Sequence, residues 1–156
     1  MSKNDRLFIS REITSAMLIP WLTKIGDYAF AGCSSLSSIT LPPSITIIGN
    51  HAFDSCSLVG PLTLPQSVIS IGDYAFSGCS SLDMVGLSNV ATIGERAFAG
   101  IAAEVIILPN TITSIGANAF ADCQNLSLLW CNFRKNAVSG APWGATNATI
   151  HYSTEA

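Results

Sequence analysis

The stretch Ile25-Gly26-Asp27-Tyr28-Ala29-Phe30 carries a pattern, Ile-Gly-x-x-Ala-Phe, that returns four more times along the 156-residue chain. The later copies span residues 48–53, 71–76, 93–98 and 115–120, so successive glycines are separated by 23, 23, 22 and 22 residues. Self-similarity at a fixed period of this length is the signature of a repeat architecture in which each copy is one structural unit. The sequence therefore predicts a repeat solenoid.

The residues between two copies of the motif also repeat, with apolar residues at i, i+3 and i+5, as in Leu36, Ile39 and Leu41. This is the L-x-x-L-x-L pattern of leucine-rich repeats, and its last two positions alternate as in a short strand with one buried face. Pro42 cannot donate to a following ladder bond, so the strand should end there. We expect five parallel strands, one per unit, that end near Leu41, Leu64, Leu87, Leu108 and Trp130.

The whole unit, Leu-x-x-Ile-x-Leu-Pro followed by Ile-Gly-x-x-Ala-Phe-x-x-Cys, resembles the BspA-like, or Treponema-type, class of leucine-rich repeats over roughly residues 18–132. Three units depart from it: Gly60 and Pro61 loosen the second strand, Ser88 follows Leu87 in the third unit, and the fourth has Ile101 for Cys and one residue fewer. We expect a right-handed array of about five coils, with a parallel β-sheet on the concave face and short helical turns or loops opposite.

Within each coil, the motif glycine is expected to permit a tight turn with unusual dihedral angles. The Ala-Phe segment should form a short helical turn with its Phe inside. Because the ends of a solenoid need caps, we assign residues 1–20 to an N-terminal cap, 21–132 to five repeats and 133–156 to a C-terminal cap. In the latter, residues 141–152 read as a turn and a final strand, and Trp143 is suited to closing the last coil.

The charge balance argues against several classes of partner. The net charge is -3, the pI is near 5.1 and only 11% of residues are charged, so no basic face for nucleic acid can form. No apolar run approaches the length of a membrane span, and residues 1–11 do not read as a secretory signal. The resemblance implies a cell-surface or secreted protein, whereas the missing signal favours a scaffold or a fragment of a longer chain.

The cysteines and histidines do not form a recognisable chemical site. Cys33, Cys56 and Cys79 recur at the repeat spacing, which indicates a ladder of buried thiols instead of the paired ligands of a zinc site; disulfides between coils remain open. His51 occupies a variable, outward position of the motif and His151 the final strand, and neither has a catalytic partner by motif. We therefore predict no enzyme activity, no cofactor and no metal.

Two functions from different classes fit this sequence. The resemblance implies a protein-interaction or adhesion module that binds a protein or a surface glycan on its concave sheet. The alternative is a structural spacer or shell element of a larger surface or virion assembly, which would have no ligand of its own and would self-associate.

The outward strand positions change from small and polar in the first coil to large and apolar in the last. The candidate partner-binding residues are Met84, Val105, Ile107, Leu128 and Trp130. Contiguous exposed apolar side chains usually mark an interface. Two other interpretations stay open: the tail from Phe133 to Tyr152 covers these residues, or the shortened fourth unit slips by one residue and turns Val105 and Ile107 inward.

Overall fold

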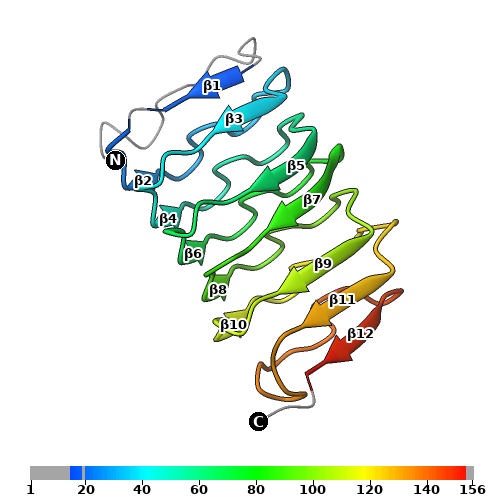
Figure 1. Cartoon of the computed structure of the whole chain (residues 1–156). Coiled ribbons are helices and arrows are strands. Elements are labelled where there is room, and N and C mark those ends of the chain that lie inside the picture. The colour runs from blue at the N-terminus through cyan, green and yellow to red at the C-terminus, as the bar shows by residue number, and fades with distance from the viewer. Residues whose placement is uncertain (1–14, 19, 154–156) are drawn as a thin grey trace.

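Each repeat unit forms one coil with a longer strand on one side and a two-residue strand on another, and the coils stack into a solenoid (Figure 1). The structure is a computed structural model that describes residues 15–18 and 20–153. All strand pairs in it are parallel, as the repeat predicts. The array has about six turns, one more than the five copies of the motif.

The longer strands follow one side of the coils. They are β1 (Ser15–Met17), β3 (Ser38–Thr40), β5 (Gly60–Thr63), β7 (Leu82–Gly86), β9 (Val105–Leu108), β11 (Leu128–Cys131) and β12 (Thr149–Tyr152). The five predicted strands are β3, β5, β7, β9 and β11. The expected strand of the tail is β12, which pairs with β11, and β1 adds a seventh by pairing with β3.

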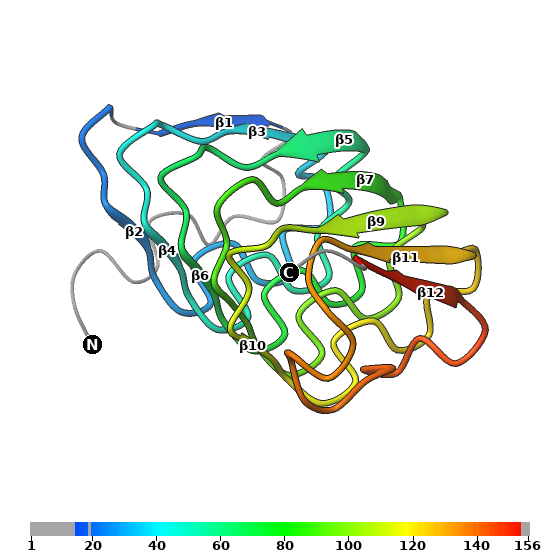
Figure 2. The same cartoon turned by 60° about the horizontal axis from the view of Figure 1, so that its bottom comes forward.

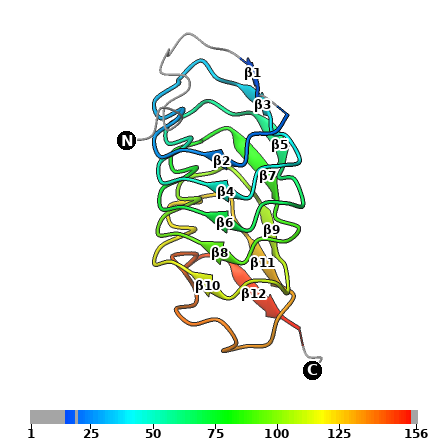
Figure 3. The ribbon, with the colours of Figure 1, turned by 90° about the vertical axis from the view of Figure 1, so that its left-hand side faces the viewer.

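A second parallel sheet, which the sequence analysis missed, runs along another side of the coils. Its strands are β2 (Lys24–Ile25), β4 (Ile47–Ile48), β6 (Ser70–Ile71), β8 (Thr92–Ile93) and β10 (Ser114–Ile115). They stack in one column, and each ends on the Ile that opens the motif (Figure 3). Figure 2 shows the two sets of strands on different sides of the same coils. Two residues are too few to show an alternating pattern, which is why periodicity did not reveal this sheet.

The sheet of longer strands is broken twice, where a single continuous sheet was expected. It separates into β1-β3, β5-β7 and β9-β11-β12, whereas the two-residue strands form one uninterrupted sheet. The first break lies at the second unit, where Leu58 is buried, Val59 is exposed and Pro61 has no N–H to donate. The second lies at the fourth unit, whose shorter loop brings the small Ala103 into the interior where other units have Leu. Both breaks coincide with departures from the repeat.

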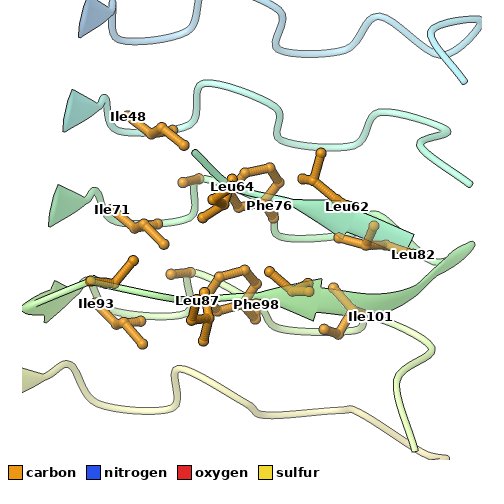
Figure 4. Close-up of a cluster of buried hydrophobic side chains, with 14 of the residues drawn as sticks. Ile48, Leu62, Leu64, Ile71, Phe76, Leu82, Leu87, Ile93, Phe98 and Ile101 are labelled. Carbon is orange, nitrogen blue, oxygen red and sulfur yellow. The ribbon is translucent and has the colours of Figure 1, made fainter. Parts of the chain in front are cut away.

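The interior is a set of side-chain ladders, of which the Phe ladder is the largest. Phe30, Phe53, Phe76, Phe98 and Phe120 are at most 1% exposed, as predicted. Their rings stack nearly parallel, with centroids 5.1, 5.2, 5.4 and 6.1 Å apart. Figure 4 shows Phe76 between Ile71 of β6 on one side and Leu62 and Leu82 of the longer strands on the other, and Phe98 between Ile93 of β8 and Ile101. Rings stacked at the separation of neighbouring coils thus occupy the centre of the solenoid.

The motif glycines are required for close approach between coils. The prediction that they adopt unusual dihedral angles was wrong. Gly49, Gly72, Gly94 and Gly116 do not have a positive φ. A Cβ atom on Gly94 would lie 2.5 Å from the backbone nitrogen of Asp73 in the preceding coil. The left-handed conformation falls two residues later, at Tyr28, His51, Tyr74, Arg96 and Asn118. Glycine is selected here by the space between backbones.

The Ala-Phe segment forms hydrogen-bonded turns, and the short helical turns expected there are absent from the described residues. The turns bond to the next coil, as in Phe53 N–H to Ala75 O at 2.7 Å. The N–H groups of these turns alternate between acceptors in the same turn, as in Ala52 N–H to Gly49 O at 3.3 Å, and acceptors in the next coil, so a continuous helix does not form. The last motif is closed by the tail, where Phe120 N–H donates to the carbonyl of the buried Trp143 at 2.9 Å. Trp143 therefore closes the last coil, as predicted.

Replacing a central member of the Phe ladder should destabilise the whole array. We expect Phe76→Ala to lower the free energy of unfolding by about 3–5 kcal/mol, because the cavity lies between two rings that cannot collapse onto each other. Chemical denaturation measures the loss, and Val59→Ala, at a side chain that is 61% exposed, is the control with little effect. A loss below about 1 kcal/mol would show that the ladder is not the core.

The two classes of glycine should respond differently to the same substitution. Gly94→Ala places a methyl group against the backbone of the preceding coil and should cost about 1–3 kcal/mol of stability. Gly86→Ala is the matched control, since its nearest neighbour would be Thr63 Cγ2 at 3.4 Å. Thermal denaturation of both variants compares them, and equal effects would contradict the close-approach explanation.

Candidate interaction surface

Outward-facing side chains of the longer strands form two parallel rows. The first row runs through Ser38, Pro61, Met84, Val105, Leu128 and Thr149, and the second through Thr40, Thr63, Gly86, Ile107, Trp130 and His151. The observed pairing brings Pro61 beside Met84 and Ile107 beside Trp130. Each row thus begins with a small polar residue, becomes apolar toward β9 and β11, and turns polar again on β12.

The five candidate partner-binding residues lie in the apolar part of these rows. Met84, Val105, Ile107 and Trp130 are 59%, 44%, 56% and 41% exposed, and Leu128 is half-buried. Ile106 and Leu108 of the same strand are buried. The one-residue slip considered for the fourth unit is therefore not observed, because the shorter loop is absorbed before β9 begins.

The tail reaches Trp130 but does not fold over the apolar rows. β12 pairs beside β11, and His151 stacks on the Trp130 ring with centroids 3.9 Å apart. The Trp130 indole Nε1–H donates to Asn132 Oδ1 at 3.1 Å. Trp130 is thus held in one orientation with part of its surface covered, while Met84 and Ile107 remain more than half exposed.

Two hollows adjoin Met84 and Val105 where the strand ladder is interrupted between β7 and β9. The first extends over Gly86 to Thr63, Ile107 and Pro109. The second, at the other end of the strands, is bounded by Pro61, Asp83, Glu104 and Asn125. We call them together the seam groove. It combines an apolar wall with two carboxylates at one end.

A second aromatic stack lies on the turn side of the solenoid. His51 stacks between Tyr28 and Tyr74, with ring centroids 4.5 and 4.8 Å apart, and its Nδ1 lies 2.7 Å from Asp54 Oδ2. These residues share one motif position in successive coils, as the sequence analysis expected for His51, but the stack itself was missed. Both faces of the imidazole are covered by rings, so this arrangement fixes the turn and leaves no face free for a ligand.

The cysteines are a buried ladder, as predicted. All five are buried, and none is bridged to another cysteine. The thiols of Cys56, Cys79 and Cys123 donate to the carbonyls of Phe30, Phe53 and Phe98 at 3.0, 3.1 and 3.2 Å. Burial raises the pKa of Cys79 to about 12 and that of Cys131 to about 11. Across residues 15–18 and 20–153, no group of three or more His, Cys, Asp or Glu side chains is arranged to hold a metal ion.

These features define a leucine-rich-repeat solenoid with an exposed apolar seam, and the sequence comparison specifies the family. Residues 3–127 match the BspA type leucine rich repeat region in six copies, so the chain belongs to that family. No curated protein matches the sequence. In the described part of the chain, no helix has the length and apolar character needed to cross a membrane.

A solved leucine-rich-repeat structure shows the same architecture, and two others are similar to the chain at lower scores. A leucine rich repeat protein of T. pallidum is 27% identical with a TM-score of 0.79, over 93% of this chain and 71% of that one. A leucine rich cell surface protein of Faecalibacterium prausnitzii is 20% identical with a TM-score of 0.43, over 93% and 61% of the two chains. A Bacteroides ovatus leucine-rich repeat protein is 20% identical with a TM-score of 0.44, over 91% and 56%. The present chain therefore spans less than two thirds of the last two.

The buried thiols should resist alkylation until the solenoid opens. The thiolate is the reacting species, and a pKa raised from 9.0 to about 12 for Cys79 keeps the thiol protonated far above neutral pH. Native protein treated with iodoacetamide at mildly alkaline pH should react at least about a hundredfold more slowly than Ser81→Cys, which adds an exposed thiol. Because the pKa is raised on folding, stability should also fall as the pH rises from 9 toward 12. Rapid native labelling would contradict this account.

Proposed function

We propose that this chain is a protein-interaction module that binds a macromolecular partner through the side of its longer strands. The binding surface is centred on Met84, Val105, Ile107, Leu128 and Trp130. The observation that carries the proposal is the concentration of exposed apolar side chains in the middle of two rows that begin with Ser38 and Thr40 and end with Thr149 and His151. Covering such a patch removes apolar surface from water, which favours binding. Scattered exposed apolar residues, in contrast, need no partner.

The scaffold favours binding because its contact residues are already ordered. Strands that are hydrogen-bonded to neighbouring coils hold the outward side chains in fixed rows, so little conformational entropy is lost on association. Trp130, stacked on His151 and bonded to Asn132, is an aromatic anchor of the kind enriched among interface hot spots. A partner could therefore be recognised without a rearrangement of the backbone.

Family membership supports this role and a location at a cell surface. Repeat solenoids generally use their extended sheet surfaces for binding other macromolecules, and leucine-rich-repeat solenoids are typically non-enzymatic. We assign the chain no catalytic activity, cofactor or metal. The location at a cell surface rests on the family alone. The partner class is a protein or a surface glycan.

Substituting the centre of the patch should weaken partner binding while leaving the fold intact. We expect Ile107→Thr to reduce the capture of partner from the native source by about tenfold, because a loss of about 1.4 kcal/mol at a central interface residue lowers the affinity by that factor. The same substitution at Ile69, on the side of the two-residue strands and equally exposed at 52%, is the matched control. Capture is quantified by mass spectrometry and the fold by thermal denaturation.

Equal capture by both variants would refute binding at this patch. Ile107→Thr is a cleaner test than Trp130→Ala, because the Trp130 ring also packs on His151 of the tail, and its loss should lower stability as well as binding. If the purified chain sediments as an oligomer that Ile107→Thr dissociates, the patch instead joins copies of the chain, as a structural shell element would.

A further inference from the structure

Gly86 leaves a gap the size of a side chain in the second outward row. Its neighbours in that row are Thr63 in the preceding coil and Ile107 in the next, and along its own strand it follows Met84. These three side chains line the hollow above it. Since Gly86 has no positive φ and a Cβ would fit beside Thr63 at 3.4 Å, the backbone does not require glycine here. The missing side chain has its effect on the surface.

The opposite end of the seam groove is acidic. Asp83 is the extra residue of an irregularity in the β5–β7 pairing, where Gly60 pairs with Leu82 but Pro61 pairs with Met84. This bulge directs Asp83 outward beside Met84, and bulges often re-aim a side chain in this way. Glu104 lies at the same end and is also exposed. In the part of the chain that the structure describes, neither carboxylate is ion-paired with Lys, Arg or His.

Among residues 15–18 and 20–153, no cationic side chain lines either hollow of the seam groove. Two unpaired carboxylates beside an apolar hollow produce a negative potential that attracts a cation and disfavours an anionic partner. Asp83 and Gly86 are three residues apart on one strand, so the acidic end and the hollow are separated by about 10 Å. The site therefore presents two different subsites at a fixed separation.

We propose that the seam groove binds a basic protein segment that inserts one aliphatic side chain over Gly86 and pairs a Lys or Arg side chain with Asp83 and Glu104. This inference rests on the proposed function, because it names the chemistry of the partner at the same patch. The aliphatic group covers Met84 and Ile107, which are the most exposed members of the patch. The cation supplies the positively charged partner for Asp83 and Glu104. Salt should weaken the charged contact and leave the apolar one.

Three short peptides separate these contributions. The probes are acetylated and amidated Ser-Arg-Thr-Leu-Thr-Arg-Ser, the same peptide with Glu for both Arg residues, and the same peptide with Ser for both. Titration of the isotope-labelled full chain, followed by amide chemical shifts, detects weak binding and locates it. We expect the Arg peptide to shift the amides of Met84, Gly86 and Ile107, to bind several-fold more tightly than the Ser peptide, and to lose this advantage at high salt.

Two variants test the two subsites. Gly86→Thr places a third Thr after Thr40 and Thr63 in the second outward row and should fold normally. It should weaken binding of the Arg peptide by about tenfold because the new side chain fills the hollow. The double variant Asp83→Asn/Glu104→Gln should lower the affinity for the Arg peptide by about threefold to tenfold and leave the affinity for the Ser peptide unchanged. Thermal denaturation confirms that both variants retain the fold, and Ile69→Thr again serves as the control on the other side of the coils.

The possible results distinguish this inference from the proposed function. If the Arg, Ser and Glu peptides shift the same amides with equal affinity, the acidic end has no role and the basic-partner inference is wrong, while binding at the patch stands. If no peptide changes the chemical shifts of the groove amides, the inference also fails. The capture comparison with Ile107→Thr then decides the proposed function separately. A dimer that Gly86→Thr dissociates would make a second copy the occupant and overturn the inference.

Discussion

Successive coils must approach each other to within the distance of hydrogen-bonded strands at the Ile-Gly-x-x-Ala-Phe corner, and the other regularities depend on this approach. Only glycine fits at position 72, because a Cβ atom there would lie 2.7 Å from the backbone nitrogen of Asn50. Asn50 in turn accepts the backbone N–H of Asp73 through its Oδ1 at 2.8 Å, so side chain and backbone alternate as a ladder. Once this corner is fixed, the Phe rings stack and the short strands pair. The corner therefore sets the separation that the rest of each coil adopts.

The two sides of the coil tolerate variation differently because only one of them touches the corner. The two-residue strands end directly at the motif, and their sheet runs without interruption from β2 to β10. The longer strands lie far from it along the chain, after a loop whose length varies. There the second unit buries Leu58 and exposes Val59, and the fourth uses Ala103, yet Phe53 and Phe98 keep their places in the ladder. Irregularity is confined to the side where it alters the outer surface and not the core.

Features that depend on regular spacing could be predicted from the sequence, whereas features that depend on contact between coils could not. The parallel solenoid, the buried Phe and Cys ladders and the closing role of Trp143 belong to the first kind, because each depends on residue type at a repeated or distinctive position. The two-residue strands belong to the second, since Lys24 and Ile25 alone show no period. The role of the motif glycine was misjudged because a glycine selected for space looks the same in sequence as one selected for φ. The stack of Tyr28, His51 and Tyr74 was visible only as one variable column of the repeat.

For the candidate surface, the sequence supplied the residues and the structure supplied their relation. Alternation around Leu62, Val85 and Ile106 was enough to place Met84 and Ile107 outside, because a buried face fixes the register of a strand. The seam groove needed three further facts: the ladder is interrupted between β7 and β9, a bulge turns Asp83 outward, and Gly86 stands between Thr63 and Ile107. Each is an exception to the repeat. In an array whose identical units would present identical surfaces, exceptions are where a distinct binding site can arise without disturbing the common core.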